Sequence, residues 1–229
     1  MLQLFFLDSL STLKLTDDNA HHATRVLRMN IGEELLISDG NGNWAKCEIE
    51  AISKREVNLK LIEKGFESPA KFNISVLQAI PKNERTKETI ELLTAAGVHK
   101  IYPWLSSRTI GKESEKWAVA AIEASKQSRR FYIPKVSEKL DTKSALDLFK
   151  DFEQILICHE AAPTSISSVV KPIKETLIVI GPEGGISDEE LAAFISAGAF
   201  QVKLGRPVLR SAHAGIAAIS AVSALMQVW

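Results

Sequence analysis

The sequence predicts an α/β protein in which a small β-barrel domain precedes a larger domain built on a mostly parallel sheet. The first third contains four short runs rich in β-branched and apolar residues, with one helical segment between the first two. Gly, Ser and Pro interrupt the periodicity at residues 65–70, and strand-like and helix-like segments alternate from residue 71 onward. We therefore place one domain at residues 1–70 and the other at residues 71–229. With 229 residues, 45% of them hydrophobic, the chain is long enough for a small and a medium domain.

The first domain is expected to contain four strands and one helix. The stretch Asp39-Gly40-Asn41-Gly42-Asn43 is typical of a β-hairpin turn. Helical spacing and an acidic first turn predict the helix, and Gly32 follows shortly after its end. The expected strands are residues 2–7, 33–38, 44–52 and 57–62, and the expected helix is residues 17–28.

The second domain alternates strands with helices, which is typical of a parallel sheet with helices on both faces. The last helix is almost purely apolar, so we expect it to be buried, either inside the domain or against a second subunit. The expected strands are residues 73–80, 100–104, 154–159, 176–180 and 201–204, and the expected helices are residues 84–96, 114–130, 188–197 and 211–228.

Composition excludes several classes of protein. The formal net charge is zero, and no apolar run approaches the roughly 20 residues of a membrane-spanning helix, so we expect no membrane association. The apolar start of the chain lacks the basic region of a signal peptide. Cys47 and Cys158 lie in strand-like runs, which favours reduced thiols over a disulfide or a zinc site. These features indicate a cytoplasmic protein without a metal.

The charge is unevenly distributed along the chain. Residues 1–64 hold 8 Lys or Arg against 10 Asp or Glu, whereas residues 81–135 hold 11 against 6. A basic stretch favours a phosphate-bearing partner, although a solvated surface explains it equally well.

Two glycine-containing turns carry most of the information about chemistry. The first, Ile180-Gly181-Pro182-Glu183-Gly184-Gly185-Ile186-Ser187, follows an expected buried strand, and Ser187 with Glu190 has the spacing of a capping box. Glycines let a ligand approach the backbone at the carboxyl end of a strand, where open parallel sheets bind ligands. The second turn, residues 204–211, follows the next strand, so we expect both turns to form one cleft. Taken alone, the first turn is equally compatible with a structural connector, because the P-loop and dinucleotide motifs are absent.

Four segments resemble motifs of the RsmE family of SPOUT methyltransferases. They are Ile180 to Ser187, Leu204 to Arg210, residues 21–29 (HHATRVLRM) and residues 125–130 (SKQSRR). The resemblance covers essentially the whole chain, in the same order.

This resemblance implies a SPOUT domain with a C-terminal trefoil knot, a rare exception to the rule against knots, after a PUA-like RNA-binding β-barrel. It implies a homodimer joined through the knotted domain and S-adenosyl-L-methionine as the cofactor. The expected reaction is methylation of N3 of a uridine in 16S rRNA, either free or in the small-subunit particle. The residues that the resemblance places at the cofactor are Ile180, Gly181, Glu183, Gly184, Gly185, Leu204, Gly205 and Leu209.

The chemistry of this reaction requires alignment and loss of a proton. A sulfonium methyl group is already an activated electrophile, so the enzyme must align it with the nitrogen. The uridine anion spreads charge onto two carbonyl oxygens, which a cation stabilises. Arg210 is the candidate catalytic residue, and pairing with a carboxylate such as Glu183 is its alternative role. The base must leave its Watson–Crick pair before reaction.

Six basic residues are candidates for RNA contact, and each has a structural alternative. Arg25 and Arg28 lie three apart on the expected helix and so share a face that can contact RNA phosphates. A surface salt bridge is the alternative role of each. The next two occupy loops, where binding residues concentrate. The last two end an expected helix, where the helix dipole explains them as well as RNA does. The six are Arg25, Arg28, Lys82, Arg108, Arg129 and Arg130.

Several positions depart from the family pattern and leave the general base unidentified. They carry no carboxylate where the family usually has an acidic or polar residue. His213 offers a titratable group near the expected site, and packing at a subunit contact is its alternative role. A ribosome assembly factor that binds without methyl transfer is therefore the alternative function. A dinucleotide-dependent oxidoreductase is disfavoured by the missing fingerprint. The positions are Lys87, Ala95, Lys126, Ala212 and His213.

Overall fold

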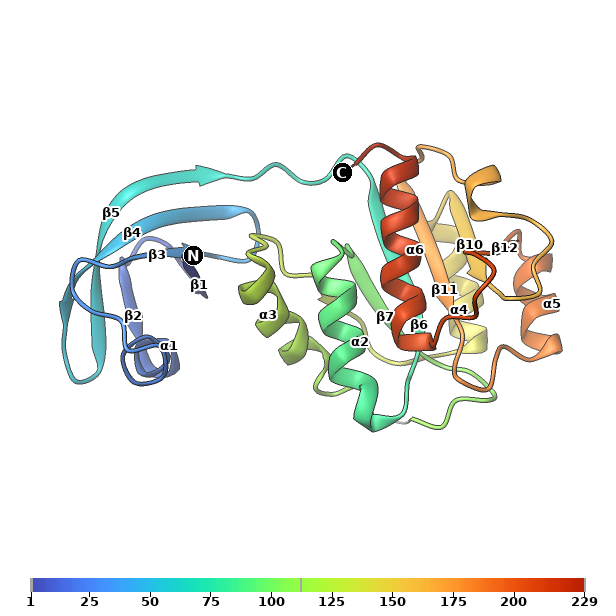
Figure 1. Cartoon of the computed structure of the whole chain (residues 1–229), viewed down its shortest axis with the longest axis horizontal. Coiled ribbons are helices and arrows are strands. Elements are labelled where there is room, and N and C mark those ends of the chain that lie inside the picture. Colours follow the sequence, from blue (N-terminus) through green and yellow to red (C-terminus); the bar gives the residue numbers. More distant parts are fainter. Residues whose placement is uncertain (1, 112, 229) are drawn as a thin grey trace. The chain divides into compact units, whose positions relative to one another are not determined.

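The computed structural model describes residues 2–111 and 113–228, without the side chains of Asn83 and Glu84. The chain divides into two compact units (Figure 1). Unit 1 comprises Met1–Pro69 and Ser125–Ile133, and unit 2 comprises Ala70–Ala124 and Pro134–Trp229. The segment Ser125–Ile133, which the sequence assigned to the second domain, thus clusters with unit 1.

Unit 1 is built on the strands β1 (Gln3–Phe6), β2 (Lys14–Thr16), β3 (Glu34–Ser38), β4 (Asn43–Ile52) and β5 (Glu56–Phe66). They form one sheet in the order β1-β3-β4-β5-β2, and the short β2 was not predicted. Strand β4 buries Ala45, Cys47 and Ile49, the period of two expected of a strand with one face in the core. Its register against β5 shifts at two places, and such bulges bend a strand.

The predicted hairpin turn joins β3 to the antiparallel β4. Gly40 and Gly42 have φ angles of 73° and 98°, which only glycine adopts without strain. The Gly42 N–H donates to the carbonyl of Phe131 at 3.0 Å, and the Phe131 ring stacks on Trp44 with ring centroids 5.5 Å apart. These contacts explain why residues 125–133 belong to unit 1.

The helix predicted at residues 17–28 is shorter than expected. Helix α1 (Asp17–His21) continues as a π-helix (His22–Val26) and then ends. Arg28 has a φ of 55°, the left-handed conformation that often closes a helix C-terminus. The prediction that Arg25 and Arg28 share a helical face is therefore wrong, because Arg28 lies beyond the helix end.

Unit 2 contains a parallel sheet in the order β12-β10-β11-β6-β7-β8, with β9 also paired to β7. Every strand pair in it is parallel, as predicted from the alternation of elements. Strands β8 and β9 have two residues each and were not predicted. The strands are β6 (Asn73–Ala79), β7 (Lys100–Leu105), β8 (Lys135–Val136), β9 (Leu140–Asp141), β10 (Gln154–Cys158), β11 (Glu175–Ile180) and β12 (Phe200–Val202).

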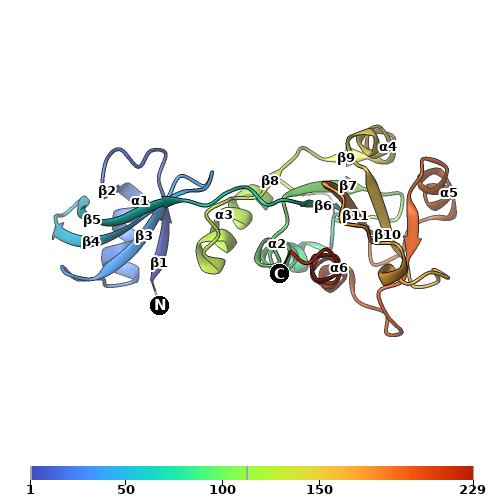
Figure 2. The ribbon, with the colours of Figure 1, turned by 90° about the horizontal axis from the view of Figure 1, so that it is seen from above.

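Helices cover both faces of this sheet (Figure 2). Ile178 and Ile180 of β11 pack with α2, α3 and α6, whereas Leu177 and Val179 pack with α4 and α5. No helix in the described residues is long and apolar enough to cross a membrane. The helices are α2 (Asn83–Ala95), α3 (Trp117–Ser128), α4 (Thr142–Leu148), α5 (Asp188–Ser196) and α6 (Ser211–Leu225), with short 3-10 turns at Phe149–Asp151 and Ile166–Ser168.

The last helix, α6, packs against α2 inside unit 2. A Cβ atom added at Gly215 would lie only 2.5 Å from Cδ2 of Leu93, so the two helices approach closely at this glycine. Ala218, Ile219 and Val222 of α6 are buried in the same core as β11. The burial predicted for this helix is thus achieved, at least on one face, within a single chain.

Candidate functional site

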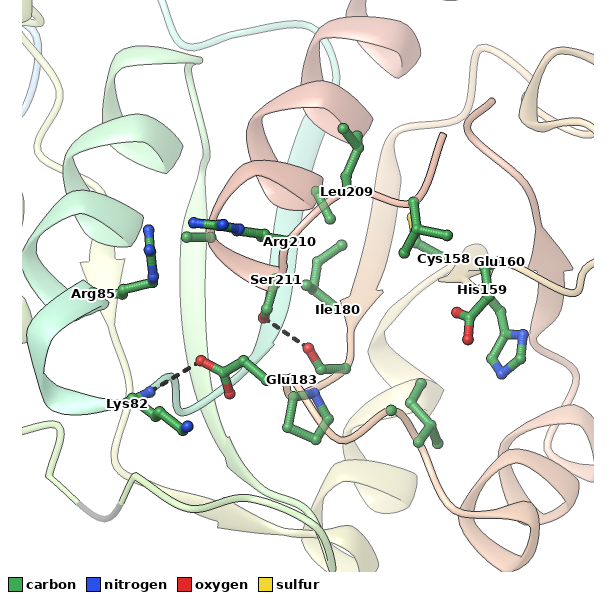
Figure 3. A pocket seen from close by; sticks show the side chains of 17 residues that line it. Lys82, Arg85, Cys158, His159, Glu160, Ile180, Glu183, Leu209, Arg210 and Ser211 are labelled. Atoms are coloured by element: carbon green, nitrogen blue, oxygen red, sulfur yellow. Dashed lines mark hydrogen bonds between the residues drawn. The ribbon is translucent and has the colours of Figure 1, made fainter. Parts of the chain in front are cut away.

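A cleft of about 500 Å³ opens at the carboxyl ends of β10 and β11 (Figure 3). A smaller hollow of about 70 Å³ adjoins it, and the two share the lining residues Cys158, His159, Glu160, Val208, Leu209 and Ala214. The turn after β11 lines the larger hollow, and the turn after β12 lines both. The two turns therefore form one cleft, as predicted.

Seven of the eight residues expected at the cofactor line these two hollows. The eighth, Gly184, is exposed and lies outside the lining, where its carbonyl accepts a hydrogen bond from Nη1 of Arg108 at 3.2 Å. The larger hollow is lined by Ile180, Gly181, Glu183, Gly185 and Leu209, and the smaller one by Leu204, Gly205 and Leu209.

The local sequence determines the shape of the first turn. Gly185 has a φ of 75°, and its N–H donates to the carbonyl of Pro182 at 2.9 Å, which closes the turn. The predicted capping box is present, because Ser187 Oγ accepts from the Glu190 N–H and the Glu190 side chain accepts from the Ser187 N–H. The start of α5 is thereby fixed directly behind the turn.

A chain of hydrogen bonds ties the two turns to the sheet. The buried amide of Gln78, on β6, donates through Nε2 to Ser211 Oγ at 3.1 Å, and Ser211 donates to the carbonyl of Gly181. At the other side of the turn, the Lys82 N–H donates to Oε1 of Glu183 at 3.2 Å (Figure 3). Loops from three separate segments are thus held around the cleft.

Three cations line the cleft: Lys82, Arg85 and Arg210. Arg210 is exposed and precedes the first turn of α6 as its N-cap residue. Among the ion pairs of the described residues there is none between Arg210 and Glu183, the alternative role considered for this arginine. Arg85 was not singled out from the sequence. Its spacing of three residues from Lys82, at the start of a helix, is the signal that points to it.

His213 and Arg85 both contact one carboxylate. Nε2 of His213 lies 3.2 Å from Oε1 of Glu88, and Nη1 of Arg85 lies 3.1 Å from Oε2 of the same residue. The hydrogen bond with His213 is the largest influence that lowers the pKa of Glu88. The histidine that departs from the family pattern therefore joins α6 to α2, next to a cation of the cleft.

The thiol of Cys158 lines the cleft in its protonated form. Burial raises its pKa to about 12, so it is a poor nucleophile at neutral pH. Cys47 and Cys158 are both free, which agrees with the reduced thiols expected from the sequence. The described residues contain no group of three or more His, Cys, Asp or Glu side chains arranged to hold a metal ion.

Four of the six RNA candidates lie in unit 1. Arg25 is exposed and lines a hollow of about 280 Å³ together with Lys54 and Arg55, two basic residues that were not singled out from the sequence. Arg129 has a φ of 53° and closes the end of α3, which accounts for its position without RNA. Burial lowers the pKa of Arg130, a half-buried residue, to about 10. The fourth, Arg28, is exposed beyond its helix.

The other two RNA candidates, Lys82 and Arg108, lie in unit 2. Both are exposed, and they contact consecutive residues of the first turn: the Lys82 N–H donates to the Glu183 side chain, and the Arg108 side chain donates to the Gly184 carbonyl. The structure therefore brings both of them to the rim of the cleft.

Comparison with known proteins agrees with this architecture. The family model of the RNA methyltransferase domain matches residues 68–223, and that of the RNA methyltransferase PUA domain matches residues 15–62. The chain is 32% identical to ribosomal RNA small subunit methyltransferase E of Mycobacterium bovis, over 99% of this chain and 93% of the relative. It is 28% identical to the protein of the same name from Bacillus subtilis, over 93% of this chain and 90% of the relative.

Two solved structures share the whole fold. The methyltransferase E of Neisseria gonorrhoeae, bound to S-adenosyl methionine, superposes with a TM-score of 0.89 at 26% identity and covers 98% of both chains. A putative methyltransferase of Legionella pneumophila, in complex with the same cofactor, has a TM-score of 0.85 at 26% identity, again over 98% of both chains. These likenesses confirm the predicted class of an α/β domain after a PUA-like domain. The chain belongs to the ribosomal RNA small subunit methyltransferase E family of RNA methyltransferases.

Proposed function

We propose that this protein transfers the methyl group of S-adenosyl-L-methionine to N3 of a uridine in 16S rRNA. The observation that carries the proposal is that the two turns after β11 and β12 line one cleft. Its relatives are named methyltransferases of small-subunit ribosomal RNA, and two similar structures hold S-adenosyl methionine. The choice of uridine N3 rests on the resemblance to the RsmE motifs.

The cleft fits a cofactor of this size and chemistry. Its volume of about 500 Å³ lies within the range of about 300–1,000 Å³ typical of small-molecule sites. A Cβ atom added at Gly205 would have Cδ of Pro207 as its nearest neighbour, 3.8 Å away, so a ligand can approach this backbone. Ile180 and Leu209 supply apolar walls, and the Glu183 carboxylate accepts hydrogen bonds. The residues proposed to hold the cofactor are Ile180, Gly181, Glu183, Gly184, Gly185, Leu204, Gly205 and Leu209.

When bound, the cofactor supplies an electrophilic methyl group. Arg210 lines the cleft and is proposed to stabilise the negative charge that develops on the uracil carbonyl oxygens as N3 loses its proton. Where the bound substrate displaces water from the cleft, this positive charge acts more strongly than in bulk solvent. The target uridine must be unpaired, because N3 is otherwise engaged in a base pair.

The partners and the assembly follow from the same family resemblance. We propose that the protein acts in the cytoplasm as a homodimer joined through its second domain, and that the second domain contains a trefoil knot. RNA contact is assigned to Arg25, Arg28, Lys82, Arg108, Arg129 and Arg130. Of these, Arg25, Lys82 and Arg108 are best supported, because their exposed side chains line or border a hollow.

Methyl transfer to a defined substrate tests the proposal. Purified protein, radiolabelled S-adenosylmethionine and either naked 16S rRNA or small subunits from a strain lacking the enzyme are incubated, and the product is mapped by primer extension. Methylation of N3 blocks base pairing, so a new stop at one uridine is expected. Binding of cofactor and RNA without transfer would favour the assembly factor instead. Absence of cofactor binding in a calorimetric titration would overturn the proposal.

A further inference from the structure

The carboxylate of Glu190 joins three segments of unit 2. The side chain is only 6% exposed. Oε1 accepts from the Ser107 N–H at 2.8 Å and from the Thr142 hydroxyl at 2.8 Å, and Oε2 accepts from the Ser107 hydroxyl at 3.0 Å and the Ser187 N–H at 3.3 Å. These partners follow β7, β9 and β11, so the loop after β7, the first residue of α4 and the N-cap of α5 meet at a single side chain.

Helix capping alone does not explain this arrangement. A capping box needs only the reciprocal bonds between Ser187 and Glu190, and these form equally well at an exposed position. Burying a carboxylate is costly unless donors surround it. The ion pairs of the described residues do not include Glu190, so neutral donors from Ser107 and Thr142 compensate its charge. The buried charge therefore holds the loop after β7 against the start of α5.

That loop carries an exposed arginine at the rim of the cleft. The Thr109 N–H donates to the Ser106 carbonyl at 3.1 Å, and the two hydroxyl groups lie 2.8 Å apart, so the turn is internally bonded. Arg108, between them, donates through Nη1 to the carbonyl of Gly184. Gly185, the next residue, lines the cleft. The guanidinium thus borders the cleft from outside, and it has four further N–H groups.

We propose that Glu190 is a positioning residue that holds Arg108 where its guanidinium binds a phosphate of the RNA strand whose base enters the cleft. The planar guanidinium suits a phosphate because it donates two parallel hydrogen bonds. Glu190 itself lines neither hollow, so it acts through Arg108. This assignment rests on the proposed function and adds to it a residue on which RNA affinity depends.

A double-mutant cycle tests the coupling between the two residues. Arg108→Ala is expected to raise the KM for RNA about tenfold, and Glu190→Gln about fivefold, with less than a twofold change in kcat and in the cofactor Kd. In the double variant, Glu190→Gln should add almost nothing to the effect of Arg108→Ala. Effects that multiply would overturn the proposal, because they would show that Glu190 acts independently of Arg108.

Control variants separate positioning from folding. Asp188→Asn removes an exposed carboxylate from the same helix turn and is expected to leave the KM unchanged. If Glu190→Gln does not fold, Ser107→Ala and Thr142→Val each remove one donor and leave the carboxylate in place. Either is expected to raise the KM for RNA two- to threefold in the presence of Arg108, and an unchanged KM in both would contradict the proposal.

A readout without catalysis distinguishes this inference from the proposed function. In Glu190→Gln, amide hydrogen exchange of residues 106–109 should accelerate, whereas exchange in Asp188→Asn should match that of the unmodified protein. The Kd for 16S rRNA, measured by filter binding, should rise in parallel with the KM. If the unmodified protein binds RNA but does not methylate it, the proposed function fails. The amide exchange of residues 106–109 and the Kd for RNA still test the role of Glu190 in that case. Unchanged exchange would overturn the inference whatever the activity.

Discussion

The hydroxyl of Ser211 donates to the carbonyl of Gly181 over 2.7 Å, and this bond joins the turn after β11 to the start of α6. Both residues line the cleft. The same hydroxyl accepts from the buried Gln78 amide, which also donates to the carbonyl of Ala79, so removing the hydroxyl takes one hydrogen bond from Gln78 and one from the Gly181 carbonyl. Such a loss costs about 1 kcal/mol or more.

Ser211→Ala is therefore expected to weaken cofactor binding about fivefold, which corresponds to about 1 kcal/mol. Isothermal titration calorimetry measures the change. Ser220→Ala, a half-exposed serine on the same helix, is the matched control and should bind like the unmodified protein. An equal Kd in both variants would show that the bond between the two turns does not shape the site.

Arg210→Ala is expected to lower kcat by about 10²–10³, because a preorganised charge opposite a developing anion is removed. The cofactor Kd should change less than threefold. Arg206→Ala is the control, since Arg206 is an exposed cation of the same loop that lines neither hollow. A defect confined to the KM for RNA would instead make Arg210 a binding residue.

Patterns of short range were predictable from the sequence. The period of two in β4, the capping box of Ser187 and Glu190, and the alternation of strands with helices are all properties of consecutive residues. The meeting of the two turns was also predictable, since parallel strands present their carboxyl ends at one edge of the sheet.

Contacts between distant residues were not predictable. Glu190 meets Ser107 across 83 residues and Thr142 across 48, and no local pattern encodes either pair. Strands β8 and β9 have two residues each and owe their conformation to β7. The position of Arg28 was predicted wrongly because the helix ends before it and Arg28 itself adopts the left-handed conformation. Glycine is the usual signal for that conformation at a helix end, and the sequence has arginine there.

Arg25→Glu is expected to weaken RNA binding and to lower the slope of log Kd against log salt concentration by about one for each phosphate that the protein no longer neutralises. Arg25 shares its hollow with Lys54 and Arg55, so a glutamate at this position also offsets the positive charges of these two residues. Filter binding over a range of salt concentrations measures the slope. Lys60→Glu, an exposed cation of β5 outside that hollow, should change the slope less. An unaltered slope for Arg25→Glu excludes a phosphate contact there.

The stability of the fold is expected to depend on pH through Glu190. Burial alone raises its pKa, but hydrogen bonds from Ser107, Thr142 and Ser187 outweigh burial and lower the pKa below its ordinary value of 4.5. A depressed pKa means that the unfolded chain takes up the proton first as pH falls. The stability that the ionised Glu190 adds to the folded state is therefore complete above about pH 4.5. It disappears as pH falls through the lower pKa of the folded state.

Urea unfolding between pH 3 and 6 checks this expectation. The free energy of unfolding should fall more steeply toward low pH in the unmodified protein than in Glu190→Gln, which cannot titrate at this position. Asp188→Asn should retain the steeper dependence. Parallel curves for the unmodified protein and Glu190→Gln would contradict the assigned pKa direction.

Gly215→Ala tests whether the last helix is fixed by packing inside one chain. Alanine is the better helix former by about 1 kcal/mol, so an unobstructed position would gain stability. Here the new Cβ would lie 2.5 Å from Cδ2 of buried Leu93, and overpacking of this kind costs about 1–3 kcal/mol. The variant should therefore unfold at lower urea concentration. Because Leu93 belongs to the same chain, the destabilisation by Gly215→Ala should be the same at all protein concentrations. A destabilisation that becomes smaller at higher protein concentration would place the contact between subunits.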